Sequence, residues 1–248
     1  LTTPKINTGL NDANGNESIK FTATSSAVNE FTAANAATGN NPALSVTGGD
    51  SNISLNLVAK GTGTVQSNGS SVKVAGKETI WVPAMAMYPN STNGCANLTQ
   101  VELTAGQPEL KCLDFDASSD ENCQFAVAFP KSWNKSTLMY QVFWTGNSTN
   151  TGNVIWACQA VAAADNDPID AAFGTAITIT DGHSGTANDL DVSAQSSALT
   201  VAGSPSNDEQ VFFQLYRDAN AGGDTFSADA RLLGIKLYFA TDLPNDAD

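Results

Sequence analysis

The chain has 248 residues, with 25 acidic and 11 basic side chains and a formal net charge of −14. A field of this sign repels phosphate backbones and anionic lipid, so we expect neither nucleic acid nor a bare membrane as a partner. No apolar run approaches the length that spans a bilayer, and the opening Leu1–Pro4 has no charged and then apolar leader. Because the first residue is not Met, we expect either processing or a further segment upstream.

The composition changes near residue 79. Residues 1–78 contain no Trp, Tyr, Met or Cys, whereas residues 79–248 hold all four Trp, four Tyr, three Met and four Cys. We therefore predict two domains, 1–78 and 79–248. A domain of about 170 residues can bury about 70% of its unfolded surface, which is enough for a core of its own. The first domain has no comparable supply of bulky apolar residues.

Within residues 1–78, apolar residues recur at alternate positions in short clusters separated by turn formers. The clusters are Ile19 and Phe21, Leu44 and Val46, Ile53, Leu55 and Leu57, and Val72 and Val74. The turn formers include Asn14–Gly15, 39–42, 48–50, 61–63 and Asn68–Gly69. This pattern predicts short strands about every ten residues. Isolated hairpins are marginal in water, so we predict an intertwined β shaft in which several copies share one core, most simply a homotrimer.

Residues 79–248 alternate apolar and polar side chains in nine or ten short segments. The predicted strands are 79–87, 109–115, 124–129, 137–144, 153–162, 176–180, 190–193, 198–201, 210–217 and 231–239. The best helical segment is a single turn at Pro168–Ala172. Many short antiparallel strands in this length favour a jelly-roll-like β-sandwich. The expected fold class is therefore all-β throughout.

The four cysteines are Cys95, Cys112, Cys123 and Cys158. Their spacing matches no zinc pattern, and the domain is too large to need disulfides, so we expect free thiols. Cys158 shares a strand face with Trp156 and should act as a small buried hydrophobe. A disulfide that involves Cys95 or Cys123 remains open, because both lie nearer turns.

The only histidine lies in Asp181–Gly185, beside a serine and an aspartate. This segment lacks the G-x-S-x-G spacing, and its polar residues crowd one turn instead of converging from separate elements. We interpret it as a solvated Asp-Gly turn and assign no catalytic residue to the chain. The protein is accordingly predicted not to be an enzyme.

Carboxylates recur in several places, but none forms a recognisable site. They are Asp114 and Asp116, Asp165, Asp167 and Asp170, and Asp218 and Asp224. A glycosidase needs two carboxylates across a cleft, and the sequence indicates no such pair. Asp165–Asp167 and 12–17 resemble calcium loops only in part, because the central Gly and terminal Glu of an EF-hand loop are missing. We predict no cofactor or metal residue.

The aromatic residues favour a core more than a binding surface. Trp81, Trp144 and Trp156 lie in alternating strands and are predicted to be buried. Trp133 lies in a turn and could stack on a sugar, although packing at a corner of the sandwich is the preferred interpretation. The predicted strands 210–217 and 231–239 carry apolar side chains on both faces. We expect one face to fill the core and the other to contact neighbouring subunits. The residues are Phe212, Phe213, Tyr216, Leu237, Tyr238 and Phe239. No ligand-binding residue is assigned.

Three segments resemble a known family. Ile53–Val65 is similar to an "LNLxPKGTGTV" stretch in fibre-like structural proteins of tailed bacteriophages, many of them marine. Trp81–Pro89 and Ala128–Asn134 are similar to the early strands of a C-terminal domain often joined to it. The sequence departs from the family at Ala59, where Pro is common, and at Met85, where a small residue is usual.

The resemblance implies a virion protein, assembled in the host cytoplasm, that attaches to tail or capsid proteins through its N-terminal end. Its head would then contact a glycan or protein on the host surface. One alternative is a capsid-anchored head fibre or decoration protein without a receptor role. Two others from different classes are a tailspike enzyme that degrades polysaccharide and a secreted lectin-like module.

Overall fold

The computed structural model describes residues 9–72 and 76–241, and it divides into two compact units, Leu1–Val72 and Lys73–Asp248. The predicted boundary at residue 79 falls inside a strand of the second unit. Both units are built from antiparallel β structure, with one short 3-10 helix at Ala84–Ala86. Within the described part of the chain, no helix is both long and apolar enough to cross a membrane.

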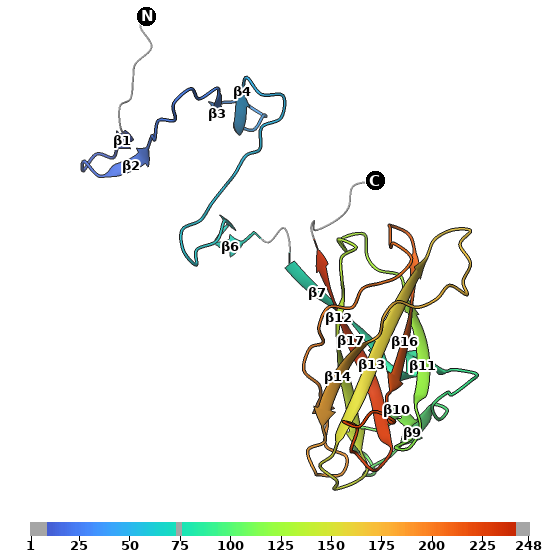
Figure 1. The fold of residues 1–248 in the computed structure, drawn as a ribbon. Coiled ribbons are helices and arrows are strands. Elements are labelled where there is room, and N and C mark those ends of the chain that lie inside the picture. The colour runs from blue at the N-terminus through green and yellow to red at the C-terminus, as the bar shows by residue number, and fades with distance from the viewer. Residues whose placement is uncertain (1–8, 73–75, 242–248) are drawn as a thin grey trace, which may run out of the picture. The chain divides into compact units, whose positions relative to one another are not determined.

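The first unit consists of three small hairpins, labelled in part in Figure 1. Their strands are β1 (Gly9–Asn11) with β2 (Glu17–Lys20), β3 (Asn29–Ala34) with β4 (Ala43–Gly48), and β5 (Gln66–Ser67) with β6 (Ser70–Ser71). The β5–β6 turn has positive φ at both Asn68 and Gly69, which is the geometry that an Asn-Gly hairpin turn favours. The turn predicted there is confirmed.

The β3–β4 hairpin has one apolar and one polar face. Phe31 pairs with Val46, and Ala33 pairs with Leu44, so these four side chains share a face. On the other face, the Thr32 and Thr47 hydroxyls lie 2.7 Å apart, and Thr47 donates to a Glu30 carboxylate oxygen at 2.9 Å. Val46 is partly covered, but Phe31 and Leu44 remain 62% and 56% exposed, so most of the apolar face stays uncovered in the described unit.

The same lack of burial extends through the first unit. No described side chain from residue 9 to residue 72 is buried. Eleven large apolar side chains are more than a third exposed: Leu10, Ile19, Phe21, Val28, Phe31, Leu44, Leu55, Leu57, Val58, Val65 and Val72. The strand predicted at Ile53–Leu57 is absent, since this segment pairs with no other part of the described chain. Val74 lies outside the described residues.

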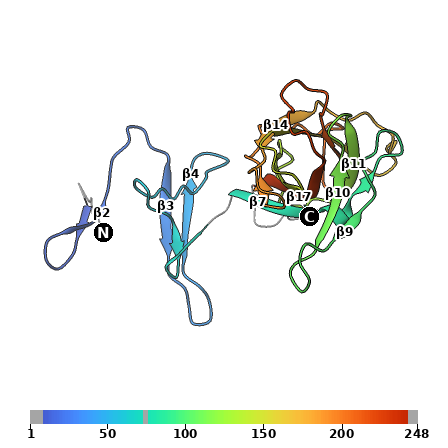
Figure 2. The same cartoon turned by 90° about the horizontal axis from the view of Figure 1, so that it is seen from below.

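The second unit is an antiparallel β-sandwich, as predicted. Figure 2 shows it from one end, with β7, β17 and β9 on one side and β14 and β11 on the other. One sheet has the order β15-β12-β17-β10-β9, with β7 also paired to β17, and the other has the order β14-β13-β16-β11-β8. The first sheet contains β7 (Gly76–Pro83), β9 (Thr99–Val101), β10 (Leu110–Phe115), β12 (Met139–Gly146), β15 (Asp191–Val192) and β17 (Ala230–Thr241). The second contains β8 (Tyr88–Pro89), β11 (Glu121–Val127), β13 (Asn153–Ala163), β14 (Ile177–Gly182) and β16 (Gln210–Arg217).

Aromatic side chains from both sheets fill the core. Trp156 on β13 packs edge-on against Phe115 on β10, with ring centroids 5.1 Å apart, and against Trp144 on β12 at 6.3 Å. Trp144 and Trp156 are fully buried, as predicted. The alternation on β16 and β17 is also confirmed, because Phe213 faces the core while Phe212 lies on the outer face.

Several predicted elements differ from the structure. Residues 198–201 form only one isolated bridge, between Leu199 and Leu138, and Pro168–Ala172 makes a turn without a helix. The strands β8 and β9 were not predicted, because each has only two or three residues and too little alternation to detect. The strand predicted at residues 79–87 begins earlier and ends at Pro83, where the 3-10 helix begins.

The four cysteines are buried and unpaired. Cys158 is fully buried with Val154 and Trp156, which confirms its predicted role as a small core residue. Burial raises the pKa of the Cys158 and Cys123 thiols well above the ordinary value. Such thiols pack as apolar groups and are poor nucleophiles.

Candidate functional site

Within the Asp181–Gly185 segment His183 is buried in a polar network, so the prediction of a solvated turn was wrong for His183, while Gly182 and Ser184 are exposed. His183 is 4% exposed, its Nδ1 lies 2.6 Å from Oδ2 of Asp191, and its Nε2 lies 2.9 Å from the Ser148 carbonyl oxygen. The Ser184 hydroxyl instead contacts Asp189 and the Thr186 carbonyl. Because both imidazole nitrogens are occupied and the hydroxyl lies elsewhere, the arrangement joins loops and does not form a nucleophile and base pair.

Asp181 belongs to the same network. Its Oδ2 accepts a hydrogen bond from Trp144 Nε1 at 2.7 Å. Burial raises the pKa of Asp181, the Trp144 hydrogen bond opposes this rise, and the nearby Asp191 carboxylate adds to it. The folded state therefore holds a proton on Asp181 at pH values where the unfolded chain has lost it.

Replacing Asp181 with asparagine is expected to make stability less dependent on pH. A raised folded pKa stabilises the fold below about pH 4, and this contribution is lost as the pH rises through the folded value. Asparagine keeps an acceptor for Trp144 without a charge. The melting temperature of Asp181→Asn minus that of the parent chain should therefore increase from pH 4 to pH 7. A difference that stays constant with pH would contradict this.

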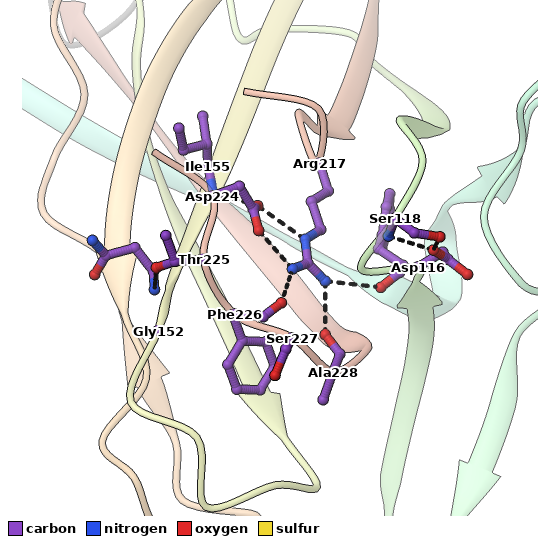
Figure 3. Close-up of polar contacts among 12 residues, drawn as sticks. Asp116, Ser118, Gly152, Ile155, Arg217, Asp224, Thr225, Phe226, Ser227 and Ala228 are labelled. Carbon is purple, nitrogen blue, oxygen red and sulfur yellow. Dashed lines mark hydrogen bonds and ion pairs between the residues drawn. The ribbon is translucent and has the colours of Figure 1, made fainter. Parts of the chain in front are cut away.

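A second buried network centres on Arg217 at the end of β16 (Figure 3). The guanidinium donates from Nε and Nη2 to the two carboxylate oxygens of Asp224, at 3.0 and 2.7 Å. It also donates to the carbonyl oxygens of Phe115, Phe226 and Ala228. Asp224 accepts a further bond from the Ile155 N–H at 3.0 Å. This ion pair is fully buried and joins both sheets to the 218–229 loop, so its role is structural.

Several of the other acidic candidates bind neighbouring groups of the protein. Asp114 pairs with Arg231 at 3.4 Å, and Asp116 accepts bonds from the backbone and hydroxyl of Ser118, which lower its pKa. Asp12 accepts the N–H groups of Asn14 and Asn16, which fits an acidic turn. Within residues 9–72 and 76–241, no three His, Cys, Asp or Glu side chains lie close enough together to hold a metal ion.

Trp133 and Trp81 differ in exposure, and therefore in whether a ligand could reach them. Trp133 is buried and packs on Phe129, with ring centroids 4.6 Å apart, which confirms the packing interpretation. Trp81 is 46% exposed, so its predicted place in the core was wrong. Trp81 and Val82 are adjacent on β7, and only one of two neighbouring strand residues can face the core. Here Val82 takes that position.

On the outer face of the first sheet, Trp81 covers Gly234 of β17. A methyl group on Gly234 would lie 2.5 Å from two atoms of the indole ring. The ring meets Phe143 edge-on with centroids 4.9 Å apart, and Lys236 Nζ lies 5.1 Å from the centroid of Phe143. We call these residues, Trp81, Phe143 and Lys236, the Trp81 platform. Its rings are closely packed against one another and against Gly234.

The outer face of the second sheet carries a groove of about 350 Å³. Its lining comes from four strands, β8, β11, β13 and β16, and from the loop that follows β13. The lining residues are Tyr88, Gln124, Val161, Ile169, Asp170, Ala171, Phe173 and Phe212. We call this site the Tyr88 groove. Its volume is within the range of small-molecule sites, about 300–1,000 Å³.

The strand register places the groove's side chains in rows. Tyr88 is opposite Gln124, Gln124 is opposite Gln214, and Gln214 is opposite Gln159, so one row crosses four strands. Gln159 Nε2 donates to Gln214 Oε1 at 2.5 Å. In the neighbouring row, Phe212 lies between Ala126 on β11 and Val161 on β13. The Ala126 side chain is small and leaves space beside the Phe212 ring.

The loop from residue 164 to residue 176 forms one wall of the groove. It returns to the sheet at Gly174, whose N–H donates to the Ala160 carbonyl at 3.1 Å. A side chain at Gly174 would approach the carbonyl oxygens of Thr200 and Ala160, at 3.0 and 3.3 Å, so glycine permits this close approach. The sequence analysis did not identify the groove. Its residues come from distant segments, and only the tertiary structure brings them together.

Comparisons with known proteins agree with the β structure but supply no function. No model of a known protein family matches the sequence. No curated protein sequence matches it either. Among solved structures, a cycloisomaltooligosaccharide glucanotransferase from Paenibacillus sp. aligns at 14% identity and a TM-score of 0.33, over 60% of this chain and 17% of that enzyme.

Two carbohydrate-binding modules are also similar. CBM35 of Abf62 from Cellvibrio japonicus aligns at 9% identity and a TM-score of 0.35, over 67% of this chain and 99% of the module. TmCBM61, solved in complex with β-1,4-galactotriose, aligns at 10% identity and a TM-score of 0.27, over 66% of this chain and 86% of the module. At such TM-scores the likenesses carry no argument about function, and the site must be interpreted from its own residues.

Proposed function

We propose that this protein is a structural appendage of a virion, in which identical first units assemble into a trimeric β shaft and the sandwich is presented to a host surface. The observation that carries the proposal is the uncovered apolar face of the β3–β4 hairpin, together with the exposed apolar side chains along residues 9–72. A surface of this kind stays uncovered only at a cost in water, and identical copies can bury it.

The resemblance of Ile53–Val65 to phage fibre proteins supports the same role. The strand order also supports it, because β10-β17-β12-β15 faces β11-β16-β13-β14, which is the eight-strand plan of a jelly roll. Jelly rolls are common in capsid and lectin domains, and this support is by analogy of fold. We propose no catalytic role for the chain. A capsid-anchored fibre is the closest alternative, and imaging of the intact particle separates it from a tail fibre.

Sedimentation velocity of the full chain over a dilution series tests the assembly. We expect the mass of three copies, where a single chain is 25.7 kDa. Phe31→Ser with Val46→Ser should weaken assembly at least about a hundredfold, since each buried apolar side chain contributes about 1.5–3 kcal/mol per copy. Thr32→Ala on the polar face serves as the matched control and should leave the trimer intact. A chain that is monomeric at every concentration, with amides in 9–72 protected from hydrogen exchange, would overturn the proposal.

A further inference from the structure

The Tyr88 groove opens on the outer surface of the sandwich, and its lining residues take no part in the two buried networks. Its walls combine three aromatic rings, Tyr88, Phe173 and Phe212, with the amide of Gln124 and the carboxylate of Asp170. Tyr88 is 51% exposed, on a strand of two residues at the edge of its sheet. An aromatic side chain that is half exposed at a sheet edge is available to a ligand.

The chemistry of the lining favours a neutral polyol. Among the described residues that line the groove none is lysine or arginine, and Asp170 alone carries a charge. With a net charge of −14 on the chain, an anionic ligand would enter an unfavourable field. An amide both donates and accepts hydrogen bonds, and a carboxylate accepts them, so the two can bind the hydroxyl groups of one ligand.

The geometry of the lining matches a sugar ring. The electron-rich face of an aromatic ring attracts polarised C–H groups, which a pyranose presents on its apolar face. Neighbouring strands lie about 4.8 Å apart, so a ring stacked on Tyr88 has its hydroxyl edge beside Gln124. Phe212 and Phe173 also line the groove, and the volume of about 350 Å³ limits the buried part of the ligand to a short segment.

We propose that the Tyr88 groove binds a neutral pyranose unit of a surface glycan. This inference rests on the proposed function, because it names the ligand class that the presented head would recognise. One shallow groove should bind a sugar weakly, and three copies on a shared shaft would raise the overall avidity without any new contact.

Saturation-transfer difference NMR on the full chain tests the site. The probes are glucose, galactose, mannose and N-acetylglucosamine, with glucuronate and galacturonate as anionic comparisons. We expect at least one neutral sugar to receive saturation from the protein, strongest at the C–H protons of one ring face. Tyr88→Ala should weaken the apparent affinity about tenfold, and Tyr88→Phe, which keeps the ring, should retain most of it.

The control is Trp81→Ala, which removes the exposed aromatic of the opposite sheet and should leave sugar binding unchanged. Melting curves of each variant separate loss of the site from loss of the fold. The proposal is overturned if no neutral sugar shows saturation that depends on Tyr88, or if only the anionic sugars bind. If sugar binding fails but the trimer still adsorbs to host cells, the appendage role is retained and the ligand is a host protein.

Discussion

Replacing Asp224 with alanine is expected to lower the free energy of unfolding of the sandwich by about 3–5 kcal/mol, because it leaves the buried Arg217 charge without its counter-ion. Arg217 is completely buried and cannot turn to solvent. The variant also removes the acceptor of the Ile155 N–H. Urea unfolding followed by tryptophan fluorescence measures the loss in the second unit alone, since the first unit contains no tryptophan.

Two variants make this test specific. Asp165→Ala removes the same charge from an exposed turn and should change stability by no more than about 0.5 kcal/mol. The double variant Arg217→Met with Asp224→Ala removes both charges, and its loss should be smaller than the sum of the single losses. Additive losses would mean that the two side chains contribute independently, contrary to the bidentate geometry.

Replacing Trp156 with alanine is expected to lower the free energy of unfolding by about 3–5 kcal/mol, because the cavity would lie between the two sheets where they cannot collapse together. Trp156 is fully buried between Phe115 and Trp144, and its Nε1 has no hydrogen-bond partner in the described chain. The loss therefore measures packing alone. Chemical denaturation, again followed by the remaining tryptophans, gives the value.

Trp81→Ala is the matched comparison for this second prediction. The same atoms are deleted, but nearly half of the Trp81 side chain is already in solvent. Its loss should be smaller, about 2 kcal/mol, in proportion to the apolar area that the ring buries against Gly234 and Phe143. If the two variants lost the same stability, the assignment of Trp156 to the core and Trp81 to the surface would be wrong.

The two units differ in what stabilises them. The sandwich buries its own core and its own ion pair, so its stability should not depend on protein concentration. The first unit forms hairpins with sound turn chemistry at Asn68–Gly69, yet none of its described side chains is buried. If it assembles as proposed, its stability is tied to concentration by mass action, and dilution should unfold it before the sandwich.

The sequence alone determined the class of the fold and most of its strands. Alternation identified β10, β12, β13, β16 and β17, because period-2 patterning follows directly from which strand face meets a core. Turn residues such as Asn68 and Gly69 located the hairpins, since positive φ is a local property. The scarcity of bulky residues before residue 79 indicated that the first unit lacks a core.

Only the tertiary structure decided which way ambiguous residues face and which distant segments meet. Alternation cannot choose between Trp81 and Val82, because both are apolar and adjacent. No local pattern shows that Arg217 and Asp224 are buried, because the contact of Arg217 with the Phe115 carbonyl joins residues far apart in the chain. The Tyr88 groove depends on strand register and on the return of a loop at Gly174, and both are long-range properties that no local pattern encodes.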